Sequence, residues 1–199
     1  MGRTRANPRK LILVSNYGAG MNSWKKSGLL HTSIKTFQKL SLLYDETYVF
    51  TYDTTQELRC FSKFIPSNVK FLPKPRWLPK LLHSIVTPLL NSYNLKGVRI
   101  IKTTQFWGFW TALLFKFLLK GKLVLRQGFQ FSKFAIKKSR WLYYLATFAE
   151  RLGYHYADNI VVTTKRDAMY IMWRYKVPKR KIRVIPVSYT HLRAHETSL

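Results

Sequence analysis

The amino-acid sequence predicts an α/β fold: a Rossmann-like, mainly parallel sheet with helices on both faces. Short apolar runs alternate with longer segments of helical periodicity, which is the pattern of repeated strand–helix–strand units. The first run, Leu11 to Ser15, lacks polar alternation, as in a strand buried on both faces. A chain of 199 residues with 47% hydrophobic content has room for one such domain with a core, but not for two of ordinary size.

Periodicity and proline define the elements of the first half. A helix is expected over about 26–43, because its apolar residues recur on one face: Leu29, Leu30, Ile34, Phe37 and Leu40. Residues 47–51 and 69–72 are short apolar runs that predict the second and third strands. The proline-rich residues 73–79 interrupt the pattern and open a helix that extends to about Tyr93, with a kink expected at Pro88.

The second half continues the alternation. Strands are expected at 98–102, 123–125, 159–163 and 182–185, separated by helices at 107–119, about 137–156 and 166–175. Strands joined by right-handed helical crossovers are parallel, and ligands bind such sheets beyond the carboxyl ends of the strands. We therefore expect the functional edge of the sheet to consist of the loops after Ser15, Thr51, Lys102, Leu125 and Thr163.

The charge of the chain is strongly positive. It carries 35 Lys and Arg residues against 8 Asp and Glu residues, a formal net charge of +27. A surface of this kind favours polyanions: phosphates, nucleic acid or the anionic leaflet of a membrane. Charge alone does not choose among them.

Cysteine content and hydropathy indicate the compartment. Cys60 is the only cysteine, which excludes an intrachain disulfide and a cysteine-based metal site and is typical of a reducing compartment. The longest apolar stretch, Phe106 to Leu119, is interrupted by Gly108, Thr111 and Lys116 and is shorter than the ~20 residues of a spanning helix. We expect a cytoplasmic protein without a membrane span, with peripheral attachment to the cytoplasmic face of the membrane as an open alternative.

Carboxylates and histidines form no obvious catalytic set. The Asp and Glu residues before position 187 have no spacing typical of a paired acid and base or of a metal site. His31, His83 and His155 lie in or near expected helices, where a surface or packing role is the commoner one. Neither a G-x-S-x-G elbow nor a Walker loop is present. The sequence therefore assigns no catalytic residue, no metal and no cofactor, and argues against hydrolase, kinase and metalloenzyme functions.

The loop after the first strand is rich in glycine. In Gly18-Ala19-Gly20, backbone N–H groups near a helix start can approach a phosphate. A dinucleotide fingerprint would also need a third glycine, where Ser23 stands, and an acid about ~20 residues further on, so a dehydrogenase is not indicated. A plain tight turn is the alternative.

Two further segments place polar side chains and glycine at the carboxyl ends of strands, where a hydroxyl-rich ligand can be bound. They are Ile100-Ile101-Lys102-Thr103-Thr104-Gln105-Phe106-Trp107-Gly108 and Leu123-Val124-Leu125-Arg126-Gln127-Gly128-Phe129-Gln130-Phe131-Ser132.

These segments resemble the amino-terminal half of family-4-type glycosyltransferases of the GT-B fold (glycosyltransferase group 1). In that family they often read D-I-I-K-T-N-Q…G…A and P-L-I-V-R-x-G. The resemblance continues at Glu150 and over residues 157–164, and it ends on residues 175–186, whose final Ile185-Pro186 runs on in the family as I-P-N-G into a second domain. It covers essentially all of residues 1–186.

The resemblance implies a sugar transfer between two domains. The amino-terminal domain holds a lipid-linked or polysaccharide acceptor, and the second domain holds the nucleotide sugar. Transfer proceeds with retention and needs no metal. Gly18, Ala19 and Gly20 would face the donor diphosphate. The acceptor side would be lined by Lys102, Thr103, Thr104, Gln105, Arg126, Gln127 and Gly128. Many members carry a histidine just after the strand that here ends at Leu125, and this chain has Arg126 instead.

The last residues differ in character from the rest. Val187 to Thr197 resemble one translated frame of a transposase adapter used in sequencing libraries. We expect residues 1–186 to be an acceptor-side domain that is cut off before its donor domain, and residues 187–199 to be a non-native tail. On this interpretation His191 and His195 have no functional role, and the fragment alone is inactive.

Residues 74–90 combine charge with an apolar stripe. Lys74, Arg76 and Lys80 cluster near Trp77, ahead of apolar residues at helical spacing. Such a segment suits an anionic membrane surface, where each cation contributes about ~1 kcal/mol. The alternative is an ordinary helix that buries the stripe on the sheet.

Two other functions remain as alternatives to a glycosyltransferase. One is a basic α/β domain that binds nucleic acid, which the charge and the 16% aromatic content favour but no RNP, KH or zinc-finger pattern supports. The other is a non-catalytic GT-B subunit that pairs with a partner.

Overall fold

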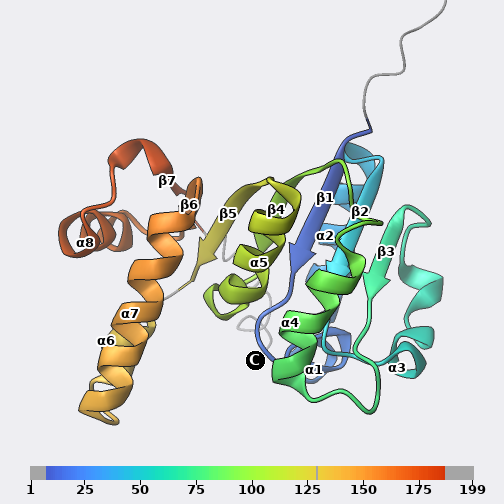
Figure 1. Ribbon diagram of the computed structural model, residues 1–199, viewed down its shortest axis with the longest axis horizontal. Coiled ribbons are helices and arrows are strands. Elements are labelled where there is room, and N and C mark those ends of the chain that lie inside the picture. The colour runs from blue at the N-terminus through green and yellow to red at the C-terminus, as the bar shows by residue number, and fades with distance from the viewer. Residues whose placement is uncertain (1–7, 129, 187–199) are drawn as a thin grey trace, which may run out of the picture.

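A computed structural model describes residues 8–128 and 130–186 and confirms the predicted α/β fold. Its seven strands form one parallel sheet in the order β3-β2-β1-β4-β5-β6-β7, flanked by helices (Figure 1). The strands are β1 (Lys10–Val14), β2 (Glu46–Phe50), β3 (Val69–Leu72), β4 (Val98–Thr103), β5 (Lys122–Gln127), β6 (Asn159–Val162) and β7 (Ile182–Val184). All seven expected strands are present, with ends that differ by one or two residues.

The helices of the described residues are more numerous than expected. They are α1 (Met21–Lys26), α2 (Leu30–Leu43), α3 (Thr55–Arg59), α4 (Lys80–Asn91), α5 (Phe109–Leu119), α6 (Phe131–Ala135), α7 (Arg140–Tyr156) and α8 (Lys165–Tyr175). The single helix expected from residue 26 is thus preceded by a separate helix, α1, and the chain turns between them at Gly28 with φ of 72°. The short helices α3 and α6 carry too few residues for a periodic pattern.

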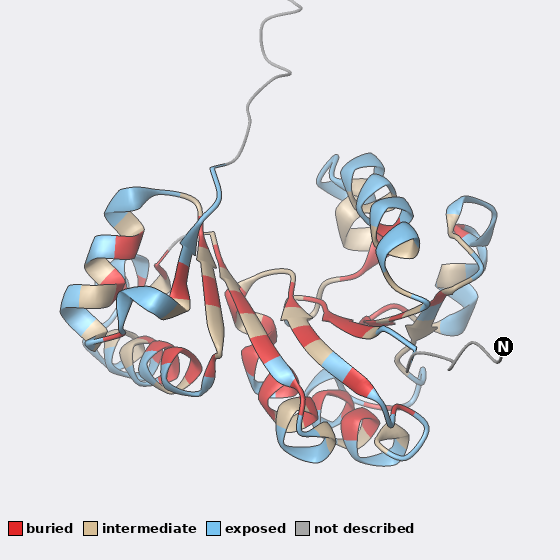
Figure 2. Ribbon diagram, turned by 90° about the horizontal axis from the view of Figure 1, so that it is seen from above, coloured by how far each residue is buried: buried red, intermediate tan, exposed pale blue. Residues whose placement is uncertain are grey.

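The sheet separates two apolar cores, because successive residues of a strand point to opposite faces. Leu13 of β1 packs in one core with Met21 of α1 and Phe37 of α2. Ile12 and Val14 belong to the other core, beneath helices α4, α5, α7 and α8. Figure 2 shows runs of buried residues along the strands, and on some strands buried residues alternate with less buried ones.

The first of these faces is covered only over part of the sheet. Lys102 of β4 lies in register with Leu13 of β1 and with Val124 of β5, so all three share that face. Leu13 is buried, but Lys102, Val124 and Arg126 are only partly buried, whereas the alternate residues Leu123 and Leu125 are completely buried. Over β4 and β5, this face of the sheet is therefore accessible in the described part of the chain.

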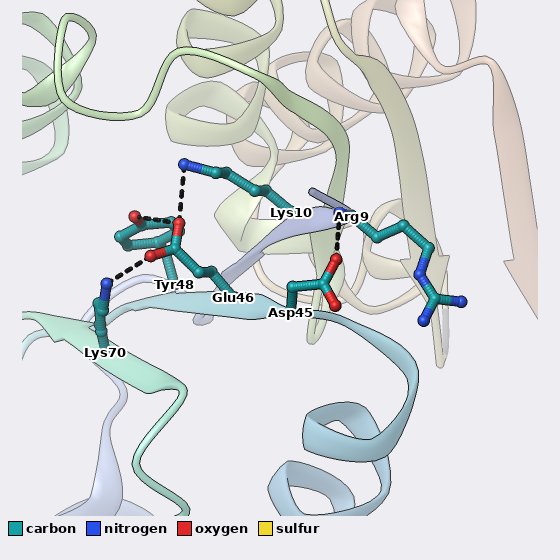
Figure 3. A network of polar contacts seen from close by, with 6 residues as sticks. All are labelled: Arg9, Lys10, Asp45, Glu46, Tyr48 and Lys70. Atoms are coloured by element: carbon teal, nitrogen blue, oxygen red, sulfur yellow. Dashed lines mark hydrogen bonds and ion pairs between the residues drawn. The ribbon is translucent and has the colours of Figure 1, made fainter. Parts of the chain in front are cut away.

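A network of charges lies at the edge of the sheet where the strands begin (Figure 3). Glu46 at the start of β2 forms ion pairs with Lys10 at 2.7 Å and Lys70 at 2.5 Å, and it accepts a hydrogen bond from the Tyr48 hydroxyl at 2.9 Å. These bonds lower the pKa of Glu46 to about 2. The network joins three neighbouring strands, β1, β2 and β3, far from the edge where ligands bind.

Within the described residues, none of the helices has the length and apolar content needed to cross a membrane. This agrees with the interrupted apolar stretch in the sequence.

Candidate functional site

The glycine loop connects β1 to α1 at the carboxyl edge of the sheet. Gly18 has a φ of 74°, which favours glycine. Gly20 directly precedes α1 and is close to Asp53, because a Cβ added to Gly20 would overlap the Asp53 carboxylate. The loop is thus shaped by one left-handed residue and by one close approach.

Asp53 follows β2 and occupies the amino terminus of α1. Its carboxylate is buried and accepts hydrogen bonds from the backbone N–H of Met21 at 2.5 Å and Asn22 at 3.4 Å. The Thr51 hydroxyl donates a third bond at 2.9 Å. An internal carboxylate therefore satisfies the N–H groups of the first turn of α1, which a bound phosphate would otherwise meet.

Lys80 adds a positive charge to the same loop. A Cβ built on Gly18 would lie 3.6 Å from the Lys80 ammonium nitrogen, so the side chain extends from the start of α4 to the glycine loop. Lys74 is held differently, because its ammonium donates to the carbonyl oxygens of Pro75 and Leu78, both at 2.9 Å. The third cation expected in this segment, Arg76, is exposed. The three cations thus have different surroundings.

Thr103, at the end of β4, and Thr104, directly after it, connect the loop after β1 with the two segments that were expected to bind the acceptor. The Thr104 hydroxyl accepts from the N–H of Asn16 at 3.1 Å, and the Thr103 hydroxyl accepts from the N–H of Arg126 at 2.9 Å. Thr103 is completely buried. The Thr104 hydroxyl therefore fixes the loop after β1, and the Thr103 hydroxyl fixes the end of β5, so the loop after β1 lies against the Lys102–Gln105 segment.

Two cations lie side by side on the accessible face of this edge. Burial and the positive charge of nearby Arg126 lower the pKa of Lys102. Arg126 makes one long hydrogen bond, at 3.5 Å, to the carbonyl oxygen of Thr104. Among the described residues no carboxylate pairs with either cation. A half-buried ammonium next to a guanidinium is an arrangement that an anionic group stabilises.

Gln105 and Gly128 also meet at this edge. A Cβ added to Gly128 would lie 3.0 Å from the Gln105 side-chain oxygen, so a side chain there would crowd Gln105. Gln105 lines a small cavity of about 30 Å³ with Asn16, Phe106, Trp107 and Phe131. The cavity lies between the glycine loop and the start of α6.

Gln127 is directed elsewhere. It is buried on the other face of the sheet, and its amide group donates to Glu150 of α7 at 3.5 Å. Glu150 is completely buried and also accepts from the Ser132 hydroxyl at 2.7 Å, the Ser132 N–H at 3.2 Å and the Tyr175 hydroxyl at 2.5 Å. Burial and the Glu150 carboxylate raise the pKa of Tyr175, which keeps its hydroxyl protonated as a donor. Gln127 therefore lies on the opposite face of the sheet from Lys102 and Arg126.

The remaining titratable groups form no second centre. His83 is buried against Phe50, and burial lowers its pKa. Its Nε2 lies 2.9 Å from the Thr51 carbonyl oxygen, so Nε2 carries the proton and Nδ1 accepts from the Thr87 hydroxyl at 2.7 Å. His31 and His155 are exposed. Among residues 8–128 and 130–186 there is no cluster of His, Cys, Asp and Glu able to hold a metal.

A larger cavity in the described part of the chain lies away from these residues. It has a volume of about 390 Å³ and lies between the carboxyl-terminal end of α7 and the loop after α8, where Tyr154, His155, Tyr175, Lys176 and Lys181 are among its lining residues. None of the site residues expected from the sequence lines it.

Asp53 and the supporting role of Glu150 were not anticipated from the sequence. A dinucleotide fingerprint predicts an acid about 20 residues after the glycine loop, whereas Asp53 lies 33 positions after Gly20. The usable signal was its place directly after an expected buried strand. Glu150 had no local signal, because its partners are 18 to 25 residues away in the sequence.

Comparison with solved structures finds a similar fold in part of two larger proteins. HepE from Anabaena, solved in complex with UDP and glucose, superposes with a TM-score of 0.54 at 10% sequence identity, over 89% of this chain and 44% of its own. Sucrose-phosphate synthase from Thermosynechococcus elongatus gives a TM-score of 0.56 at 14% identity, over 89% and 48%. Both are GT-B glycosyltransferases. The chain thus spans less than half the length of these two proteins.

A shorter chain of the same sucrose-phosphate synthase matches over nearly its whole length, 91%, with a TM-score of 0.53. No protein-family profile matches the chain, and no curated protein matches it by sequence. At 10–14% identity the structural likeness establishes the fold and leaves the residues to be argued from their own geometry.

Proposed function

We propose that this chain is the acceptor-side half of a glycosyltransferase, which transfers a sugar from a nucleotide-sugar donor to a lipid-linked or polysaccharide acceptor with retention. The proposal rests on the fold together with the polar residues at the carboxyl edge of its sheet. The chain corresponds to somewhat less than half of two GT-B glycosyltransferases, and its carboxyl edge gathers the glycine loop, Lys102 and Arg126 in one place. HepE was solved with UDP-glucose, which supports a nucleotide sugar as donor.

The acceptor would contact Lys102, Arg126 and Gln105. Lys102 and Arg126 repel each other in a partly buried position, so an anionic group of the acceptor would relieve an existing unfavourable interaction. The phosphate of a lipid-linked sugar has this chemistry. The donor diphosphate would lie on the Lys80 side of the Gly18–Gly20 loop, because Asp53 already occupies the amino terminus of α1.

No catalytic residue is assigned within this half. The carboxylates that the described residues bring to the carboxyl edge are engaged at helix starts: Asp53 at α1, Glu57, which accepts from Thr54, at α3, and Asp167, which accepts from the Thr164 hydroxyl, at α8. Groups that bind the donor and assist departure of the diphosphate would belong to a second domain. The 199-residue chain alone should then show no transfer.

A transfer assay with the uninterrupted gene product tests the proposal. Purified protein would be incubated with radiolabelled UDP-sugars and a lipid extract that contains phosphate-linked acceptors. We expect labelled lipid from the longer protein and none from the 199-residue chain. In the longer protein, Lys102→Met should raise the KM for acceptor by about tenfold, the loss expected for one charged hydrogen bond. Lys102→Arg, which keeps the charge, is the matched control.

Absence of transfer with every donor would contradict the proposal. Turnover by the 199-residue chain equal to that of the longer protein would contradict the proposal that this chain is only the acceptor-side half of the enzyme. An unchanged acceptor KM in Lys102→Met would remove Lys102 from the site.

A further inference from the structure

Helix α4 exposes its apolar side and buries its polar side. The residues that face the sheet are His83, Ser84, Thr87 and Pro88. The residues that face outward are Leu81, Leu82, Ile85, Leu89 and Leu90, which are 46–74% exposed. Helix α2, on the other face of the sheet, has the usual arrangement: it buries Phe37 and exposes Lys35 and Lys39. An ordinary surface helix would turn its apolar stripe to the core.

Hydrogen bonds fix α4 in this orientation. Both ring nitrogens of His83 are bonded, one to the Thr51 carbonyl oxygen and one to the Thr87 hydroxyl. Ser84 and the Tyr52 hydroxyl lie 2.6 Å apart. Rotating the helix to bury its leucines would leave these polar groups without partners in the core, which is costly. The exposed stripe therefore follows from the packing of the helix.

Helices α5 and α7 extend the apolar surface. All three helices lie on the same face of the sheet, with α5 packed against both α4 and α7 (Figure 1). Small residues of α7 face inward, namely Ala146, Ala149 and Gly153. The exposed large side chains of α5 and α7 are Trp110, Phe117 and Leu118, and Trp141, Tyr144, Leu145 and Phe148. Large exposed apolar side chains gathered on neighbouring helices are typical of an interaction site.

The charge of this surface is of one sign. Helices α4, α5 and α6 contain no carboxylate, and the only carboxylate of α7, Glu150, is completely buried. Lys137, Lys138 and Arg140 are exposed at the start of α7, and Arg76 is exposed ahead of α4. Both helices begin at the carboxyl edge of the parallel sheet, so their cations gather at the edge that holds the candidate site.

We propose that the outer face of α4, α5 and α7 binds the surface of an anionic membrane. Its apolar side chains would enter the boundary between headgroups and acyl chains, and the cations at the helix starts would contact phosphates. Trp77, 80% exposed at the entrance of α4, and Trp141, 71% exposed at the start of α7, suit that boundary. A second copy of the chain is a poor occupant, because each copy carries a net charge of +27.

The proposal extends to the acceptor in one respect, which rests on the proposed function. Lys102 and Arg126 lie on the opposite face of the sheet, at the carboxyl edge where the cations of the helix starts would contact headgroups, so the acceptor headgroup would reach them around that edge. A lipid-linked acceptor then reaches the site by diffusing in the membrane. Membrane binding itself does not depend on sugar transfer, so a vesicle experiment separates the two ideas.

Vesicle co-sedimentation of the 199-residue chain tests the surface. Vesicles of phosphatidylcholine with phosphatidylglycerol should bind the chain, and phosphatidylcholine alone should bind it much more weakly. The triple variant Leu81→Gln, Ile85→Gln and Leu89→Gln should lower the partition coefficient by about tenfold or more, since it removes three inserted side chains but keeps good helix formers. The matched control is Leu42→Gln with Leu43→Gln, which changes exposed leucines of α2.

A charge variant tests the second half of the surface. Lys137→Glu with Lys138→Glu should reduce binding to anionic vesicles and remove most of its salt dependence, since phosphate contacts are screened by salt. Thermal unfolding of every variant should match the parent, because all changed side chains are exposed. Equal vesicle binding by the parent and the triple variant would overturn the proposal. So would a dimer, seen by analytical ultracentrifugation, that the triple variant dissociates.

Discussion

At the scale of single residues, the carboxyl edge is built from polar groups that are already engaged. Asp53 stabilises the first turn of α1, and Thr103 and Thr104 hold the loops after β1 and β5 in place. Lys102, Arg126 and Lys80 differ from these, since they bring positive charge to the edge without a carboxylate partner among the described residues. An anion bound at this edge, as proposed, would stabilise these cations.

Glu46 makes the stability of the fold dependent on pH. Its pKa is lowered from 4.5 to about 2 by hydrogen bonds from Lys10 and Lys70. A carboxylate with a depressed pKa in the folded state stabilises the protein above its unfolded pKa, and that contribution is lost as the pH falls through the folded pKa. We expect Glu46→Gln to be less stable than the parent at pH 7 and the difference to shrink between about pH 4.5 and 2.

Urea unfolding of the parent and Glu46→Gln over pH 2–7 measures this difference. Asp45→Asn is a useful comparison, because among the described residues Asp45 accepts a hydrogen bond from the Arg9 backbone N–H and forms no ion pair with a cationic side chain. A stability difference for Glu46→Gln that stays constant down to pH 2 would show that the ion pairs contribute nothing.

At the scale of elements, Glu150 joins four of them. From α7 it accepts hydrogen bonds from β5, from α6 and from α8, through Gln127, Ser132 and Tyr175. The loop between β5 and α6, which carries Gly128, is therefore positioned by a residue on a different helix. This explains how a short helix such as α6 is held at the edge of the site.

Replacing Glu150 should be among the most destabilising single changes in this half of the sheet. Glu150→Ala removes one acceptor and leaves several buried donors unpaired, for which we expect a loss of roughly 3–5 kcal/mol in the free energy of unfolding. Tyr175→Phe removes a single donor to a charged acceptor and should cost about 1.5–3 kcal/mol. Urea unfolding followed by circular dichroism measures both. A loss below that of Tyr175→Phe for Glu150→Ala would contradict the central role of the carboxylate.

At the scale of the whole molecule, the chain is an α/β unit with one face that is ready for a partner. One face of the sheet lies under α4, α5, α7 and α8, and the outer sides of α4, α5 and α7 expose many large apolar side chains. The opposite face is accessible over β4 and β5. A nucleic-acid-binding domain would be expected to present aromatic side chains among its cations at one groove, whereas here the exposed aromatics follow the outer stripes of α5 and α7.

Residues 187–199, which lie outside the described residues, are expected to contribute nothing to folding. The chain cut after Pro186 should therefore have the same thermal midpoint as the 199-residue chain. Differential scanning calorimetry of the two proteins is the measurement, and a midpoint lowered by several degrees in the shorter chain would refute the interpretation of this segment as an adapter-derived tail.

The sequence by itself determined the class of fold and the positions of the strands. Apolar runs such as Leu11–Val14 are long enough to be recognised locally, and their alternation with helices leaves a parallel sheet as the favoured solution. It also determined that the segments around Lys102 and Arg126 end at one edge, because parallel strands align their carboxyl ends. Short helices such as α3 and α6 were missed, since five residues carry no period.

Only the tertiary structure decided how each face is used. The apolar stripe of α4 is compatible with a buried helix, the slightly favoured interpretation, and with a membrane-facing one. Its direction was settled by His83, Ser84 and Thr87, whose partners lie on neighbouring strands and within α4 itself. In the same way Asp53 meets α1, and Glu150 meets Tyr175, across long stretches of chain. Local sequence patterns indicate the secondary structure and the burial that a residue favours, whereas contacts between distant segments determine which groups its side chain bonds to.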